Sequence, residues 1–299
     1  MHALSDAATN MTAGVIKKVE GERQFALMTW VEIAVVAGLI TQLYAEILAD
    51  LASEWWNVSS SSYGMLIPPL AAYIAFMRRR TLLSIPAQPD LRGLWMIGLA
   101  SLLLIGGRLA AEFYLTRISI VPLVAGLVWT FWGVQRLKVL SFPLVLLSTM
   151  VPLPAIIYNA TALPLQLFAS SAATTAGQAL GVSIYCQGNV IHLANTSLGV
   201  VEACSGLQSL IALLVASLLV GFLENASVWG RVVLFLLASP LAILVNILRI
   251  TGTAILADYR LEFAMGFYHS FSGWLVFLVG YGSLWLLGKL VFRWTGKKP

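Results

Sequence analysis

The sequence VVEACSGLQSL, residues 200–210, joins a polar segment to a long apolar one. From Gly206 to Leu223 the chain contains no charged residue. An apolar run of about 20 residues can cross the hydrocarbon core of a bilayer as a helix. The stretch therefore predicts a transmembrane helix that begins near Gly206, with Cys204 just before it.

Similar apolar runs recur along all 299 residues, of which 59% are hydrophobic and only 10% are charged. Soluble domains carry roughly 25% charged residues, so the composition excludes an ordinary soluble protein. It predicts an all-α polytopic membrane protein with about eight transmembrane helices. The predicted spans are 25–48, 65–77, 94–109, 118–134, 139–157, 206–223, 232–256 and 267–292.

Polar segments flank and interrupt this transmembrane domain, which we assign to residues 25–292. A polar tail precedes it at 1–24, where no apolar run indicates a cleavable signal peptide, and a basic tail follows at 293–299. Within the domain, residues 158–203 are only weakly apolar and then rich in turn-forming and β-branched residues. We expect a helix and a short hairpin there, as a small extracytoplasmic or interfacial insertion.

The basic residues gather in short loops between apolar runs, at Arg78–Arg80, at Arg136 and Lys138, and near Arg231. Loops of this kind lie in the cytoplasm under the positive-inside rule. The net charge of +5 therefore indicates membrane orientation, and we expect no nucleic-acid partner. With eight spans, both termini and these loops are expected to lie on the cytoplasmic side of a membrane that the chain crosses several times.

The same topology puts three reactive residues at the outer ends of spans. Cys204 lies before the sixth span, Arg249 near the end of the seventh, and His269 at the start of the eighth. The segment from Arg231 to Arg249 extends about 27 Å as a helix, close to one hydrocarbon thickness. We expect the three residues to lie together on the extracytoplasmic face.

These residue types suit thiol chemistry. A cysteine needs a neighbouring cation or base to become a thiolate, and a histidine can carry the proton. An arginine can stabilise an oxyanion or hold a carboxylate. Ser205 and Gly206 at a helix start, together with Asn246, are expected to support the substrate or the oxyanion.

From the residues alone, other interpretations stay open. Cys204 could be a small buried side chain or form a disulfide with Cys186, Arg249 could extend to the membrane surface, and His269 could be solvated. We treat His192 as structural. No metal-binding or nucleotide-binding motif is present, so we expect no metal and no cofactor.

The sequence resembles the exosortase/archaeosortase family of membrane-embedded cysteine transpeptidases over about residues 50–290. The resemblance depends on VEACSGL at 201–207, NILRI at 246–250, and FYH at 267–269 followed by Gly273. It implies Cys204 as nucleophile, His269 as acid and base, and Arg249 as the third catalytic residue.

The resemblance also implies the substrates. Family members cut exported proteins near a carboxyl-terminal sorting tail, made of a short Pro-Glu-Pro-like motif, an apolar helix and a basic end. A thioester acyl-enzyme forms, and a cell-surface acceptor is expected to resolve it. The expected partners are therefore such exported proteins, an acceptor and the lipid bilayer.

Two residues depart from the family pattern. Tyr63 stands where the family often has a histidine, and Gln208 stands where an arginine commonly follows. Both departures bear on the substrate type. The alternative function is a non-enzymatic transporter or polysaccharide-export subunit, which would place ionisable residues along a path at the membrane midplane. A structural partner whose cysteines form a disulfide is a third possibility.

Overall fold

The structure, a computed structural model of the chain, describes residues 35–194, 196–200, 206–260 and 266–295. The chain divides into two compact units, residues 1–51 and 52–299. In the first unit the described part belongs to the helix Val35–Asn57, which continues across the boundary into the second. All other elements belong to the second unit.

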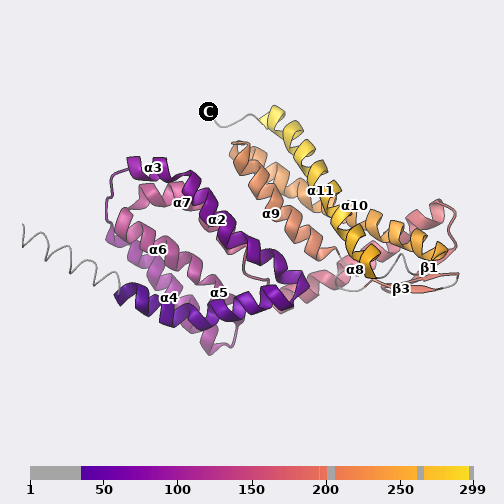
Figure 1. Cartoon of the computed structure of the whole chain (residues 1–299), viewed down its shortest axis with the longest axis horizontal. Helices are drawn as coiled ribbons and strands as arrows, with labels where there is room; N and C mark the ends of the chain where they lie inside the picture. The colour runs from indigo at the N-terminus through magenta and orange to yellow at the C-terminus, as the bar shows by residue number, and fades with distance from the viewer. Residues whose placement is uncertain (1–34, 195, 201–205, 261–265, 296–299) are drawn as a thin grey trace, which may run out of the picture. The chain divides into compact units, whose positions relative to one another are not determined.

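The first half of the second unit is helical (Figure 1). Its elements are η1 (Ser59–Leu66), α2 (Ile67–Met77), α3 (Arg79–Ser84), η2 (Leu91–Gly93), α4 (Leu94–Leu109), α5 (Phe113–Ile118), α6 (Ile120–Trp132) and α7 (Val134–Ser148). α4 packs against α5 and α6, and α2 packs against α7.

The second half combines four helices with a small sheet. Its elements are α8 (Ala155–Ala179), β1 (Ile184–Gln187), β2 (Val190–Leu193), β3 (Ser197–Gly199), α9 (Leu207–Leu223), α10 (Val228–Tyr259) and α11 (Gly266–Thr295). α9, α10 and α11 pack on one another around buried Leu213, Leu234 and Leu284. α8 packs against α10.

Five helical segments within the described residues are long and apolar enough to cross a membrane. They are Val35–Asn57, Leu91–Leu109, Phe113–Trp132, Val228–Tyr259 and Phe271–Thr295, and Leu207–Leu223 is a shorter apolar helix. The all-α, multi-pass membrane class is confirmed. The number of eight spans stays a prediction.

The predicted second span, 65–77, is close to the observed helix, whereas the predicted fifth span, 139–157, differs from the observed structure. The helix of the second span, α2, is only 11 residues long, and its two prolines occupy the first helical positions, where they cost no hydrogen bond. Instead of one helix over 139–157, α7 ends at Ser148 and α8 starts at Ala155. Pro152 and Pro154 lie between them, and proline disfavours helix at the residue before it.

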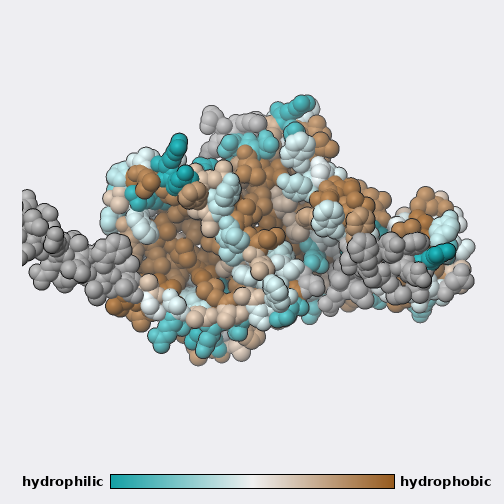
Figure 2. All heavy atoms as spheres, in the orientation of Figure 1, coloured by the Kyte–Doolittle hydropathy of each residue, from teal (hydrophilic) through white to brown (hydrophobic). Residues whose placement is uncertain are grey.

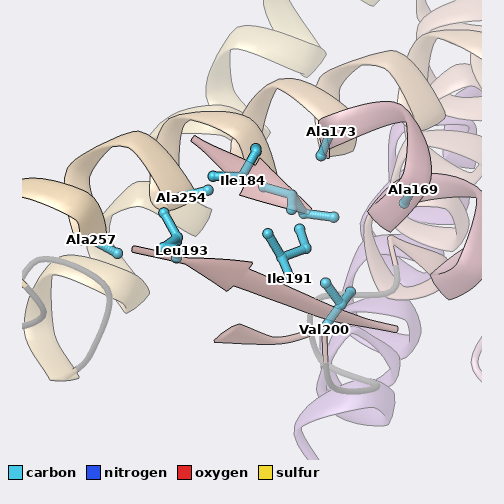
Figure 3. Packing of buried hydrophobic residues seen from close by; sticks show 9 residues of the cluster. Ala169, Ala173, Ile184, Ile191, Leu193, Val200, Ala254 and Ala257 are labelled. Atoms are coloured by element: carbon cyan, nitrogen blue, oxygen red, sulfur yellow. The ribbon is translucent and has the colours of Figure 1, made fainter. Parts of the chain in front are cut away.

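The expected insertion contains more structure than a hairpin. β1, β2 and β3 form an antiparallel sheet in that order, and β1 was not among the predicted strands. The sheet packs on α8 and on the far end of α10 (Figure 3). The packed side chains are Ala169, Ala173, Ile184, Ile191, Leu193, Ala254 and Ala257. The alanines on α8 let the sheet and α10 approach it closely. The helix is weakly apolar because it also buries Gln166, Ser170 and Thr174.

α10 is longer than one membrane crossing. Its 32 residues extend about 48 Å, against about 30 Å for a hydrocarbon core. Because its last turns pack on the sheet, the excess length lies on the sheet side. Arg249 lies next to the sheet-packed part of α10, between Ile247, which is partly buried against the sheet, and Ile250, which is buried there.

The predicted inner loops meet at one end of the second unit. Arg78, Lys138 and Arg231 line one cavity there, and Ser227 Oγ at the start of α10 donates to the carbonyl of Thr295 at the end of α11 at 3.1 Å. In Figure 2, hydrophobic residues cover the middle of the helices, and hydrophilic residues gather near α3 and near the end of α11. The grouping of these loops follows the charge-based prediction.

Candidate active site

The start of α9 lies directly against α10. Gly206 precedes α9 in the left-handed conformation, with φ +84°, and its carbonyl accepts the first helical hydrogen bond from Leu210 N at 2.8 Å. A Cβ built on Gly206 would lie 2.6 Å from Nδ2 and 2.8 Å from Cγ of Asn246. Asn246 is 2% exposed. A glycine is required here both by the backbone conformation and by the close approach of the amide.

One turn further along α10, Arg249 lies against α11. A Cβ on Gly273 would lie 2.9 Å from Nη2 of Arg249 and 3.2 Å from its Cζ. The arginine is half-buried, its Nε is buried, and its carbonyl accepts from Thr253 Oγ1 at 2.8 Å. The guanidinium is thus packed between α10 and α11. It fits there because Gly273 has no side chain.

These two contacts join the three stretches of sequence that predicted the site. Gly206 comes two residues after Cys204 in the chain, and Gly273 comes one helical turn after His269 on α11. Asn246 and Arg249, three residues apart on α10, lie between them. The contacts therefore bring glycines close in sequence to Cys204 and His269 against two neighbouring side chains of α10.

Not every predicted residue falls in the described part of the chain. Cys204 and Ser205 lie outside it, and for His269 the structure gives the backbone within α11. The roles of Cys204, Arg249 and His269 therefore stay predictions. Cys186 is a free thiol whose Sγ donates to the carbonyl of Gly188 at 3.1 Å, so the structure does not contain the alternative disulfide. The ring of His192 stacks on that of Tyr185 in the paired strand, with centroids 4.6 Å apart, and its structural role stays a prediction.

A cavity of about 180 Å³ with polar and apolar lining residues lies next to α9, lined from that helix by Ile211. Ile211 is roughly 7 Å along the helix from Gly206. The opposite walls come from η1, from the end of the helix Val35–Asn57 and from the start of α8. The lining residues are Glu54, Val58, Ser60, Ser61, Tyr63, Pro152, Leu153, Ala155, Tyr158, Asn159 and Ile211.

An ion pair fixes one wall of this cavity. Glu54 Oε2 lies 2.5 Å from Nη1 of Arg117, which is 13% exposed, and Glu54 Oε1 accepts from Ser61 Oγ at 3.3 Å. Trp55 Nε1 donates to the carbonyl of Met150 at 3.0 Å. Sequence reasoning did not predict Glu54 and Tyr158 in this cavity, or the pairing of Glu54 with Arg117. The opposite charges on two predicted outer loops were the only signal for the pair.

Tyr63, at the position of the family's histidine, lines the same cavity. Burial raises the pKa of its phenol to about 12, and Glu54 and Tyr158 act in the same direction. An unfolded tyrosine titrates near pH 10, so the unfolded chain releases this proton first. We expect the folded state to lose stability between about pH 10 and about pH 12, and to keep it in full below pH 10.

Alkaline unfolding of Tyr63→Phe tests this expectation. Because the variant has no phenol to ionise, its free energy of unfolding should fall less than that of the wild type between about pH 10 and about pH 12. An equal fall in both proteins would show that Tyr63 is solvated.

Two glycines with the same backbone conformation allow a matched test of the α9–α10 contact. Gly181 also has φ +84°, but a Cβ there would meet nothing within 4 Å. We expect Gly181→Ala to cost about 1 kcal/mol through the left-handed conformation alone. Gly206→Ala should cost about 1–3 kcal/mol more, because the new methyl group overlaps the Asn246 amide.

Thermal unfolding in detergent measures both effects. In an Asn246→Ala background the extra cost of Gly206→Ala should shrink, because Nδ2 and Cγ are gone. If Gly206→Ala and Gly181→Ala were equally destabilising in the wild-type background, the start of α9 would not lie on Asn246.

The described residues contain no group of three or more His, Cys, Asp or Glu side chains that could hold a metal ion. The family model described as "Transmembrane exosortase (Exosortase_EpsH)" matches residues 55–286, more than three quarters of the sequence. No curated protein and no solved structure matches the chain. The matched region includes all three stretches that predicted the site. The chain therefore belongs to the transmembrane exosortase family.

Proposed function

We propose that this protein is a membrane-embedded cysteine protease or transpeptidase that processes the carboxyl-terminal sorting tails of exported proteins. Family membership supports a membrane transpeptidase role in sorting. The observation that carries the specific proposal is that Asn246 and Arg249 of α10 contact Gly206 and Gly273. The neighbours of the proposed nucleophile and of the proposed acid–base residue thus lie on one side of one helix.

The proposed reaction has two covalent steps. The thiolate of Cys204 attacks the scissile carbonyl carbon, and Arg249 and backbone N–H groups stabilise the oxyanion. The carbon–nitrogen bond breaks, His269 gives its proton to the leaving amine, and a thioester remains. An acceptor nucleophile, or water, then attacks the thioester carbonyl, His269 takes a proton from it, and the thiolate is released.

The reaction is proposed to occur on the outer face of a bacterial cytoplasmic membrane. Two positions on α9 support this orientation: Phe222, near its end, lines the basic cavity, whereas Gly206, close in sequence to the proposed nucleophile, precedes its start, roughly 24 Å away along the helix. If the basic loops face the cytoplasm, the site faces outward. Exported substrates with a membrane-held apolar tail would reach it there.

The transporter or export-subunit alternative has less support. That class of function predicts ionisable residues along a path at the membrane midplane. Here two cavities with ionisable linings lie at the ends of α9, and the described residues 207–223 between them carry no charge. The short apolar helix between the cavities is packed against α10 and α11.

Trapping of the thioester tests the proposal. The chain is co-produced with an exported reporter whose tail has a Pro-Glu-Pro motif, an apolar helix and a basic end. We expect reporter cleavage, and a covalent adduct that neutral hydroxylamine releases, since hydroxylamine cleaves thioesters. An adduct that resists hydroxylamine, or a panel of such tails left uncut by correctly inserted protein, would count against cysteine-dependent processing.

A further inference from the structure

A large basic cavity lies at the other end of α9 from the proposed active site. Its volume is about 630 Å³, within the range of small-molecule sites. The ends of α2, α7, α9 and α10 form its walls. The lining residues are Arg78, Ile85, Gln135, Lys138, Val139, Ser141, Phe142, Phe222, Asn225 and Arg231. Among these lining residues, all in the described part of the chain, three have basic side chains and none has a carboxylate.

Arg78 is held at the cavity by aromatic rings. Its Cζ lies 5.0 Å from the centroid of the Phe222 ring, and that ring stacks on Phe142 at 3.8 Å with an interplanar angle of 6°. The rings position the guanidinium without neutralising its charge. Nearby Arg136 already has a hydrogen-bond acceptor, since its Nη2 donates to the carbonyl of Ile85 at 2.8 Å.

Arg231 lines the cavity from the first turns of α10. Its stem runs along Gly221 of α9, where a Cβ would lie 2.9 Å from Cγ of the arginine. Its Nε is buried and has no hydrogen-bond acceptor among the residues that the structure describes. Within that part of the chain no carboxylate forms an ion pair with Arg78, Lys138 or Arg231. A buried N–H donor without an acceptor destabilises the folded state, so an anion bound beside Arg231 would be favourable.

The cavity favours a phosphate group. Two planar guanidinium groups from different helices can each offer paired N–H donors to phosphate oxygens, and Gln135, Ser141 and Asn225 add neutral polar groups. The surrounding loops are the ones that the positive-inside rule assigns to the cytoplasm. Basic cavities between membrane helices on that side meet the headgroups of anionic lipids.

We propose that this cavity binds a phosphate group, carried by an anionic phospholipid headgroup of the cytoplasmic leaflet or present as free phosphate. Arg78 and Arg231 hold the phosphate oxygens from α2 and α10, and Lys138 supplies a third positive charge from α7. The site is independent of Cys204 and of the processing reaction.

Native mass spectrometry and thermal unfolding of the full chain, purified in detergent without phosphate, test the site. The probes are phosphatidylglycerol, inorganic phosphate and a neutral glycolipid. We expect phosphatidylglycerol to be retained and to raise the unfolding temperature. Arg78→Gln and Arg231→Gln should each weaken this binding about tenfold to a hundredfold, the usual effect of a lost charged hydrogen bond.

Arg80→Gln is the matched control, because it removes the same charge from an exposed position outside the cavity. Stabilisation by phosphatidylglycerol alone identifies the lipid as the source of the phosphate, and stabilisation by inorganic phosphate as well identifies the free ion as a ligand. If Arg231→Gln does not fold, Arg78→Gln and Lys138→Gln carry the test. The proposal is overturned if the cavity variants bind like Arg80→Gln, or if the neutral glycolipid stabilises the wild type equally.

Discussion

Replacement of Cys204 by alanine is expected to abolish tail processing, with a loss of more than about a thousandfold. Without the sulfur no thioester can form, and the remaining groups can only hold the substrate. The rate of reporter cleavage, normalised to the amount of inserted protein, measures the loss. The hydroxylamine-sensitive adduct should disappear together with it.

Cys186→Ala is the internal control, because Cys186 is the other cysteine of the chain. Its thiol donates to the carbonyl of Gly188 in the turn between β1 and β2, and it forms no disulfide. We expect nearly full activity from this variant. If Cys204→Ala processed the reporter normally, the thiol mechanism would be wrong and the transporter function would take precedence.

Arg249→Lys is expected to lower the rate of processing by about a hundredfold to a thousandfold, the usual cost of losing one oxyanion donor. The substitution keeps the charge but replaces a planar group with a point charge. The structure shows why the shape matters: the guanidinium is packed against Gly273, and a Cβ there would already lie 2.9 Å from Nη2. An ammonium group cannot reproduce that position and the paired donors together.

Steady-state kinetics separates the two roles that Arg249 could have. A fall in kcat indicates oxyanion stabilisation, and a rise in KM with kcat unchanged indicates that Arg249 holds a substrate carboxylate. Arg260→Lys serves as the control, since Arg260 is exposed just after the end of α10. Equal activity of Arg249→Lys and wild type would restrict Arg249 to a packing role.

The sequence predicted best where one physical signal dominates. The predicted span 94–109 is the same as α4, and α9 differs from its predicted span by one residue, because these apolar runs have abrupt polar ends. The grouping of Arg78, Lys138 and Arg231 followed from loop charge alone. The motifs that predicted Cys204 and His269 also contain Gly206 and Gly273, the two glycines that contact α10.

Features that depend on contacts distant in sequence could not be predicted. The break between α7 and α8 was missed for a different reason: it lies inside an apolar run, and hydropathy was given more weight than the local signal of Pro152 and Pro154. The Glu54–Arg117 pair joins residues 63 positions apart, and single loops gave no reason to connect them. β1 was missed because the strand is only four residues long and mixes apolar with polar residues. Its extended structure depends on pairing with β2.

The packing of the sheet on α10 has a consequence for how the chain matures during synthesis. The apolar face of the sheet, with Ile191 and Leu193, is completed by Ala254 and Ala257, about 60 residues later in the chain. At roughly 5–20 residues per second, a ribosome needs about 3 to 12 seconds to make that segment. During that interval the strands have only α8 to cover them. The insertion of α10 is therefore the event that completes the packing of the sheet, and a chain truncated before Ala254 would leave its strands open to proteases.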